Sequence, residues 1–230
     1  AVEPILGNQS LMAPGVNTWS ALGGDPYGET DEYIQYSGTS MAAPTVAGSC
    51  ALIRQYYMDG WYPTGTARPS NAFTPSAALI KATIINGASE MTGSGAYEMG
   101  EDWYPNNNQG WGRVNLDDAL LFQGDTRGLL AYDDRTGIST GETTTYMIGL
   151  GDTSMPLEIS LVWSDYPGTP FSNPNLVNDL DLVVRAPDGT VYAGNQYEGY
   201  DPGESKKHAG ERDRPNNVEC VLVISDLQVG

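Results

Sequence analysis

The chain has 230 residues, of which 40% are hydrophobic, so it can form one large domain or two small ones around a real core. Acidic residues outnumber basic residues by 29 to 11, and the net charge of −18 argues against nucleic-acid binding, because phosphates would be repelled. No run of about 18 apolar residues occurs, so the sequence predicts no membrane-spanning segment.

The most specific chemistry is carried by residues 37–44, which read Ser-Gly-Thr-Ser-Met-Ala-Ala-Pro. Gly38 lets the backbone turn sharply, and the apolar run that follows predicts a helix from about Ser40 to Asp59-Gly60. Unpaired N–H groups and the positive end of the helix dipole can stabilise an alkoxide or an oxyanion there. Ser40 is therefore a candidate nucleophile, although the commonest role of a serine before an apolar run is to cap a helix.

Two further helices are predicted in the first half. Thr74 is expected to cap one, with Pro75 at its first position, and Asn115 to cap a short one with Asp117 and Asp118 in its first turn. The intervening residues 61–71 are rich in Pro, Gly and Thr and are expected to form a surface loop.

The pattern becomes alternating and β-branched after Gly124. Strands are predicted at Thr143–Ile148, Leu157–Trp163, Leu180–Val184, Val191–Ala193 and Val218–Ile224. Pro187-Asp188-Gly189 is expected to form a tight turn. We therefore expect two domains, residues 1–124 and residues 125–230, with the second an antiparallel β-sandwich or jelly roll.

Four motifs of the first half, in the same order, resemble those of the subtilases, the subtilisin-like serine peptidases of family S8. They are Met12-Ala13-Pro14-Gly15-Val16, the octet at 37–44, the stretch Thr74 to Lys81 and the stretch Asn108 to Asn115. The resemblance implies a serine endopeptidase that acts on polypeptides, with Ser40 as its nucleophile. It also implies that Gly38, Thr39 and Met41 lie near the oxyanion and substrate, and that the fold is the C-terminal part of an α/β domain with a parallel sheet.

The second half also carries a resemblance. Residues 160–165, 176–182 and 216–219 are similar to the C-terminal β-barrel domain of the large oxidatively stable alkaline proteases, and more loosely to the P domain of kexin-like convertases. In that family further strands follow the Asn-Asn-Val-Glu segment, so the sandwich is expected to be incomplete.

Calcium is a predicted structural cofactor of this half. Asp179 and Asp181 lie two apart in an expected strand and so share a face, as do Asn217 and Glu219. Oxygen ligands from neighbouring strands suit calcium, and like charges on one face would repel without a cation. Asp213 is added to the candidate ligands because it is close to Asn217 in the sequence. The resemblance also implies calcium, because the family's barrel domain binds it. Alternatively, these carboxylates face water or pair with arginines, of which Arg185, Arg212 and Arg214 are near in sequence.

The chain lacks the partners that a serine nucleophile needs. A base must take the serine proton, yet the one histidine, His208, lies far after Ser40 in an expected loop, whereas subtilases run Asp, His, Ser. Asn8 and Asn17 are too close to the Ala-Pro-Gly loop to be the family's oxyanion asparagine. We therefore expect the Asp, the His and that Asn on an N-terminal segment or companion chain outside this sequence, which would also bury the apolar helix.

A second hypothesis is that the catalytic machinery has been lost and that the protein is an extracellular structural or adhesive module.

The two cysteines, Cys50 and Cys220, are expected to be buried free thiols, although a disulfide bond between them, which would join the two halves, stays an alternative. Composition and the resemblance imply a secreted or extracellular protein. Oxidation of Met41 beside Ser40 is expected to slow the enzyme.

Overall fold

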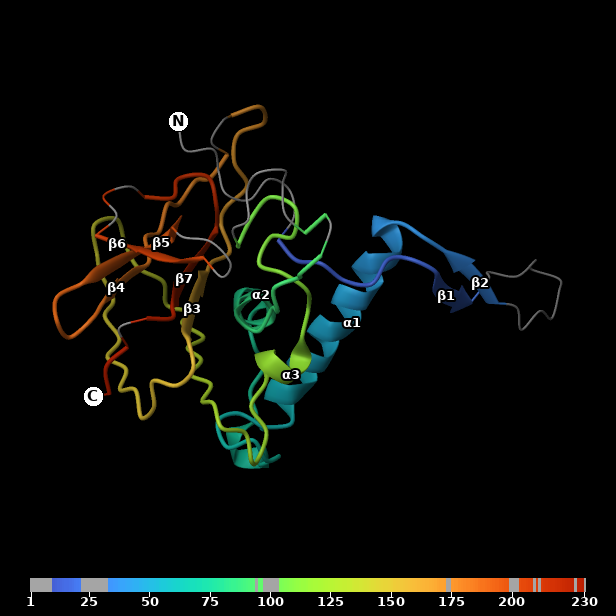
Figure 1. Cartoon of the computed structure of the whole chain (residues 1–230), viewed down its shortest axis with the longest axis horizontal. Coiled ribbons are helices and arrows are strands. Elements are labelled where there is room, and N and C mark those ends of the chain that lie inside the picture. Colours follow the sequence, from blue (N-terminus) through green and yellow to red (C-terminus); the bar gives the residue numbers. More distant parts are fainter. Residues whose placement is uncertain are drawn as a thin grey trace.

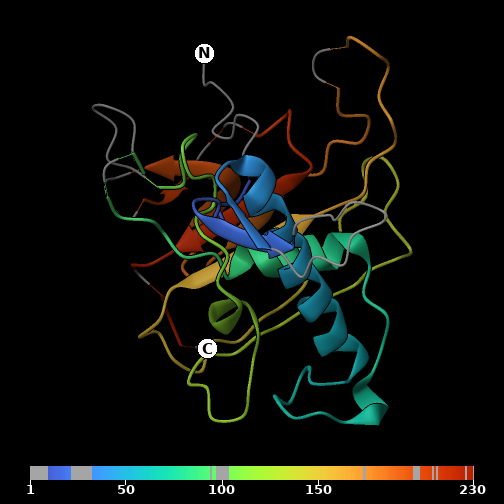
Figure 2. The same ribbon diagram turned by 90° about the vertical axis from the view of Figure 1, so that its right-hand side faces the viewer.

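The computed structural model describes residues 10–21, 33–93, 95–96, 104–172, 175–198, 203–208, 210, 212–225 and 227–229. Figure 1 shows helices α1, α2 and α3 on one side of the molecule and strands β3 to β7 on the other. The long helix α1 extends away from the body, and the ribbon of β1 and β2 lies at its outer end (Figures 1 and 2). Within the described ranges, no helix is both long and apolar enough to cross a bilayer.

Helix α1, Thr39–Met58, confirms the predicted helix after the octet. Its N-cap is Gly38, and no side chain caps it, so the cap role considered for Ser40 is wrong. At the other end Ile53, Tyr56 and Tyr57 are buried, and the Asp59 amide donates to the Gln55 carbonyl at 2.8 Å. The carboxyl half of α1 is therefore packed in the core, whereas the first three turns are largely exposed.

Helix α2, Ala77–Asn86, begins later than predicted, because its cap is Ser76 and not Thr74. The Ser76 hydroxyl accepts from the Leu79 amide at 3.0 Å, the usual contact of a capping serine. The Ser76 amide in turn donates to Asp133 Oδ2 at 2.9 Å, so a residue from the second half of the chain holds the loop before the helix. The 3₁₀-helix η1, Pro69–Asn71, lies in the insertion between α1 and α2.

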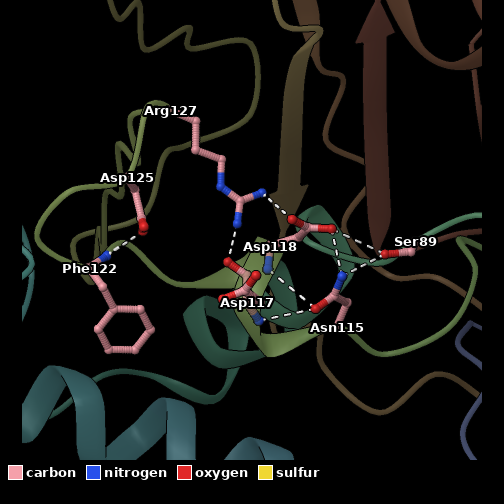
Figure 3. A network of polar contacts seen from close by, with 7 residues as sticks. All are labelled: Ser89, Asn115, Asp117, Asp118, Phe122, Asp125 and Arg127. Atoms are coloured by element: carbon pink, nitrogen blue, oxygen red, sulfur yellow. Dashed lines mark hydrogen bonds and ion pairs between the residues drawn. The ribbon is translucent and has the colours of Figure 1, made fainter.

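Helix α3, Leu116–Ala119, is capped by Asn115 as predicted. Asn115 Oδ1 accepts from the amides of Asp117 and Asp118, and its Nδ2 donates to Asp118 Oδ2 at 2.6 Å (Figure 3). Arg127 binds the same turn, through an ion pair with Asp118 at 2.8 Å and a hydrogen bond to the Asp117 carbonyl. The chain just after Gly124 is thereby tied to α3.

All regular strands pair antiparallel. Strands β1, Thr18–Ala21, and β2, Tyr33–Tyr36, form a two-stranded ribbon. Strand β3, Leu157–Val162, pairs with β7, Val218–Val223, and places Ser160 opposite Cys220. The third sheet has the order β4-β5-β6, formed by Val183–Arg185, Val191–Glu198 and Glu204–Lys207, and the predicted turn at 187–189 joins β4 to β5.

The predicted strand Thr143–Ile148 is absent, because this stretch is irregular and largely exposed. Instead of pairing with another strand, this stretch places the Tyr146 ring against the Tyr132 ring, with the ring centroids 4.3 Å apart, and leaves Met147 exposed. Two antiparallel sheets do contact each other around Tyr192, Val221 and Val223, but a complete sandwich is not established.

The main core crosses the predicted boundary at Gly124. Val218 and Cys220 of β7 belong to the same buried cluster as Ile53 of α1, Ile84 of α2 and Trp111. In the described ranges the one parallel pairing is the isolated bridge between Met12 and Arg113. The molecule thus combines helices and sheets, and the parallel sheet expected from the sequence is not among its regular strands.

Candidate active site

Ser40 lies in the first turn of α1 and is exposed, with Gly38 and Thr39 exposed beside it and Met41 half-buried. No described residue accepts a hydrogen bond from the Ser40 hydroxyl or from its amide N–H. A free amide at the positive end of a 20-residue helix is a donor for an anion. The local geometry therefore suits a nucleophile whose own N–H contacts the oxyanion.

The Ala-Pro-Gly loop holds the start of this helix. The Gly38 amide donates to the Gly15 carbonyl at 2.7 Å. A Cβ atom at Gly15 would lie 2.7 Å from the Gly38 carbonyl oxygen, so only glycine permits this approach of the two chains. The Asn17 amide donates to the Ser37 hydroxyl at 2.8 Å and joins the same two segments. Hydrogen bonds thus join two motifs that lie apart in the sequence, directly before Ser40.

The other two motifs support this loop from behind. The Met12 amide donates to the Gly112 carbonyl at 2.8 Å, and the Val114 amide donates to the Met12 carbonyl at 2.9 Å. Helix α2 contacts α1 through the buried hydrogen bond between Tyr57 and Thr83, at 3.0 Å. All four motifs found in the sequence are therefore brought together around α1.

An apolar groove of about 610 Å³ lies between α1 and α2. Its walls include Val46 and Cys50 of α1, Ile80 and Ile84 of α2, and Leu11. Elsewhere on α1, the apolar side chain of Leu52 is 53% exposed. Apolar surface that is left open on a helix is suited to contact another apolar segment.

His208 is not part of this site. It follows β6, is exposed, and donates its backbone amide to the Val191 carbonyl at 2.7 Å. In Figure 1, strand β6 lies on the left of the molecule, whereas the start of α1 lies on the right, near the β1–β2 ribbon. The interpretation of His208 as a loop residue therefore fits its position, and the described residues contain no base for Ser40.

The predicted calcium ligands lie in the second half and have several partners. Asp179 pairs with Arg214, and Asp213 accepts from the side-chain amides of Asn195 and Asn216. Asn217 is engaged elsewhere: its Oδ1 accepts from Lys81 Nζ at 3.2 Å. That oxygen is thus occupied by a lysine of the other half.

Glu219 is the most unusual of these residues. It is 1% exposed; one carboxyl oxygen accepts from the Leu182 amide, and the other, Oε1, has no partner among the described residues. Burial, together with repulsion from the carboxylates of Asp213, Asp181 and Asp179, raises the pKa of Glu219 to about 7, although the hydrogen bond from the Leu182 amide opposes the rise. A buried oxygen of this kind fits a cation, but no three acidic, cysteine or histidine side chains of the described ranges are arranged to hold one. The fit to calcium is therefore partial.

Sequence reasoning missed two polar residues that organise the second half. Asn195 is buried in β5 with a φ of 56°, and its side chain accepts from the Cys220 amide at 2.9 Å and donates to the Val218 carbonyl at 2.7 Å. The Gly194-Asn195 pair directly after the expected strand Val191–Ala193 is a signal for such an irregularity. Lys81 belongs to the motif Thr74 to Lys81, and nothing in the sequence indicates that its side chain reaches Asn217.

Residues 7–112 match the sequence profile of the Subtilase family, peptidase S8. This segment carries Ser40, two of the other motifs in full and the first part of the fourth, and it is a segment of the subtilase family of serine peptidases. The resemblance drawn from the four motifs is confirmed.

Relatives extend over most of the chain. The Serine protease/ABC transporter B family protein tagA of Dictyostelium discoideum is 34% identical over 87% of this chain and 11% of its own length. The tagD protein of the same organism is 28% identical over 93% of this chain, and tagB is 26% identical over 93%. The chain spans only 11% to 14% of the length of these relatives.

Proposed function

We propose that this chain is the serine-bearing part of a serine endopeptidase. A histidine outside the sequence takes the Ser40 proton while Oγ attacks the scissile carbonyl carbon, and the Ser40 N–H donates to the oxyanion. The amine leaves with that proton, and an acyl-enzyme on Ser40 remains. Water then attacks the acyl carbon, with the same histidine as base, and releases the acid and free Ser40.

The observation that carries this proposal is the exposed Ser40 at the free amino end of α1, held by the Gly15–Gly38 contact. A serine that served only as a cap would accept from a backbone amide of its own helix, and Ser40 does not. Family membership adds the reaction class and polypeptides as substrates.

A companion segment is part of the proposal. We propose that it supplies the Asp, the His and the oxyanion Asn, and that its apolar strands cover the groove between α1 and α2. Support comes from the groove itself and from the exposed first turns of α1, which a soluble protein would not leave open. The parallel sheet expected from the sequence would be formed by these strands.

The test uses the polypeptide extended upstream of Ala1 beside the 230-residue chain. Translation of the upstream coding sequence should contain an Asp-Gly segment and a His-Gly-Thr-His-like segment. A fluorophosphonate probe should label the extended wild type, should fail on Ser40→Ala, and should fail on the 230-residue chain, which has no base. Absence of both upstream segments would favour the inactive structural or adhesive module instead, and labelling of the short chain would show that the account of the missing base is wrong.

For the second half we propose an antiparallel sandwich of the P-domain type that is stabilised by calcium. The supporting observation is the unpartnered, buried Oε1 of Glu219 beside further carboxylates. Removal of calcium with a chelator should lower the melting temperature by several degrees, and Glu219→Gln should abolish that difference. An unchanged melting temperature would eliminate calcium from the proposal.

The names of the relatives join a serine protease to an ABC transporter, and the present chain corresponds to a small part of each. We propose that it performs the peptidase step inside a larger protein. We also propose an extracellular or secreted location for this part. Protease protection of the tagged protein in intact cells tests the location, because a segment on the outside is digested without lysis.

A further inference from the structure

Lys81 contacts two surfaces, one in each half of the chain. Its stem lines the groove between α1 and α2, while its Nζ donates to Asn217 Oδ1 at 3.2 Å in the second half. Long lysine stems commonly cover apolar surface while the ammonium group reaches a polar partner. One residue of α2 therefore joins the groove to the β3–β7 pair.

The Asn217 end of this contact is rigid. Asn217 Nδ2 donates to the Trp163 carbonyl at 3.0 Å, and the Trp163 amide donates to the Asn217 carbonyl at 3.3 Å. The Trp163 indole is fixed as well, because its Nε1 donates to the Asn178 carbonyl at 2.9 Å. With its amide nitrogen engaged, Asn217 presents its oxygen to Lys81, at the point where β3 ends and β7 begins.

The ammonium group of Lys81 depends on this oxygen. It is half-buried, burial lowers its pKa, and no carboxylate of the described ranges forms an ion pair with it. A desolvated cation without an acceptor raises the free energy of the folded state. Removal of the Asn217 oxygen alone should therefore destabilise this contact region more than removal of both Lys81 and the Asn217 oxygen. A second contact, from the Ser160 hydroxyl to Asn86 Oδ1 at 2.9 Å, ties the end of α2 to β3.

We propose that Lys81 is a positioning residue that couples the second half of the chain to the groove, so that β3 and β7 fix the wall on which the companion segment docks. This inference rests on the proposed function and adds a role for the second half in it. The second half is then needed to hold α2 in the orientation that the companion segment recognises.

The test measures docking of the companion segment independently of catalysis. Cys50 lines the groove, so in the extended polypeptide the docked segment should protect its thiol from a maleimide, compared with the 230-residue chain. Cys220, which is 6% exposed, reports general unfolding of the same molecule. Lys81→Met keeps the apolar stem but loses the donor, and Lys206→Met, an exposed lysine of β6, is the matched control.

Lys81→Met should raise the Cys50 reaction rate roughly tenfold with no change at Cys220, the size expected for loss of one hydrogen bond to a charged group. Asn217→Leu should raise it further, and the double variant should react more slowly than Asn217→Leu alone. Equal protection in wild type and Lys81→Met, additive effects of the two changes, or equal exposure of both cysteines would each overturn the coupling. Absence of Cys50 protection in the extended wild type would instead refute the companion segment, and the coupling with it.

Discussion

At the scale of single residues, the backbone contact between Gly15 and Gly38 shapes the candidate site, and the buried carboxyl group of Glu219 is the main feature of the second half. Gly15 and Gly38 touch through their backbones, which positions Ser40 without any side chain between them. Glu219 is enclosed by β5 and β7, and a Cβ atom at Gly194 would lie 2.4 Å from its Oε2. Both contacts exist only because a glycine leaves the space.

Glu219 makes stability depend on pH when calcium is absent. Its pKa rises from an ordinary 4.5 to about 7 in the folded protein, so the folded state binds a proton that the unfolded state has released. The stability from this group is therefore complete below about pH 4.5 and is lost as pH rises to about 7. With a chelator present, the free energy of unfolding should fall by about 1 to 3 kcal/mol over that interval.

Urea unfolding at a series of pH values measures this change. Glu219→Gln should flatten the profile, whereas Glu198→Gln, at an exposed position at the end of β5, should leave it as it is. A wild-type profile that rises from pH 5 to pH 7 would contradict the raised pKa.

At the scale of elements, the helices show which sequence signals are sufficient. Helix α1 followed from its long apolar run, and α3 followed from Asn115, a cap-type residue with two acidic residues in the turn after it. Helix α2 was misplaced because Thr74 and Ser76 both cap well, and Pro75 suits a first position as readily as a loop. The decisive contact, from the Ser76 amide to Asp133, comes from a loop 57 residues away.

The corrected cap gives a direct test. Ser76→Ala should lower the free energy of unfolding by about 1 kcal/mol, since the Leu79 amide loses its acceptor. Thr74→Ala removes an exposed hydroxyl and should change the free energy by less than about 0.5 kcal/mol. Denaturant melts of both variants measure the two values, and the reverse order would restore the cap that the sequence suggested.

At the scale of the whole molecule, the predicted boundary at Gly124 separates two kinds of secondary structure but not two cores. Val218 and Cys220 are buried with Ile53 and Trp111, and Arg127 ties the connecting segment to α3 (Figure 3). Composition can show where helices give way to strands. It carries no information on contacts such as Lys81 to Asn217, which are 136 residues apart, so the coupling of the halves and the partners of the acidic residues could not be predicted.

Because the core is shared, the chain should unfold as one unit. Calorimetry of the 230-residue chain should show a single transition, and residues 1–124 alone should fail to fold, since they lose the side chains of β7 that cover α2. Circular dichroism and proteolysis of the shortened chain provide the check. Two separate transitions, with the first half stable alone, would establish independent domains at Gly124.

The ribbon of β1 and β2 has a consequence for the behaviour of the chain in solution. Trp19, 65% exposed, and Tyr33 lie on a two-stranded sheet whose outer edges have no partner among the described strands, next to the exposed turns of α1. Open edges and apolar surface favour association between copies, whereas the net charge of −18 opposes it. Salt screens that repulsion, so the isolated chain should remain dispersed in dilute buffer and form reversible clusters as ionic strength rises.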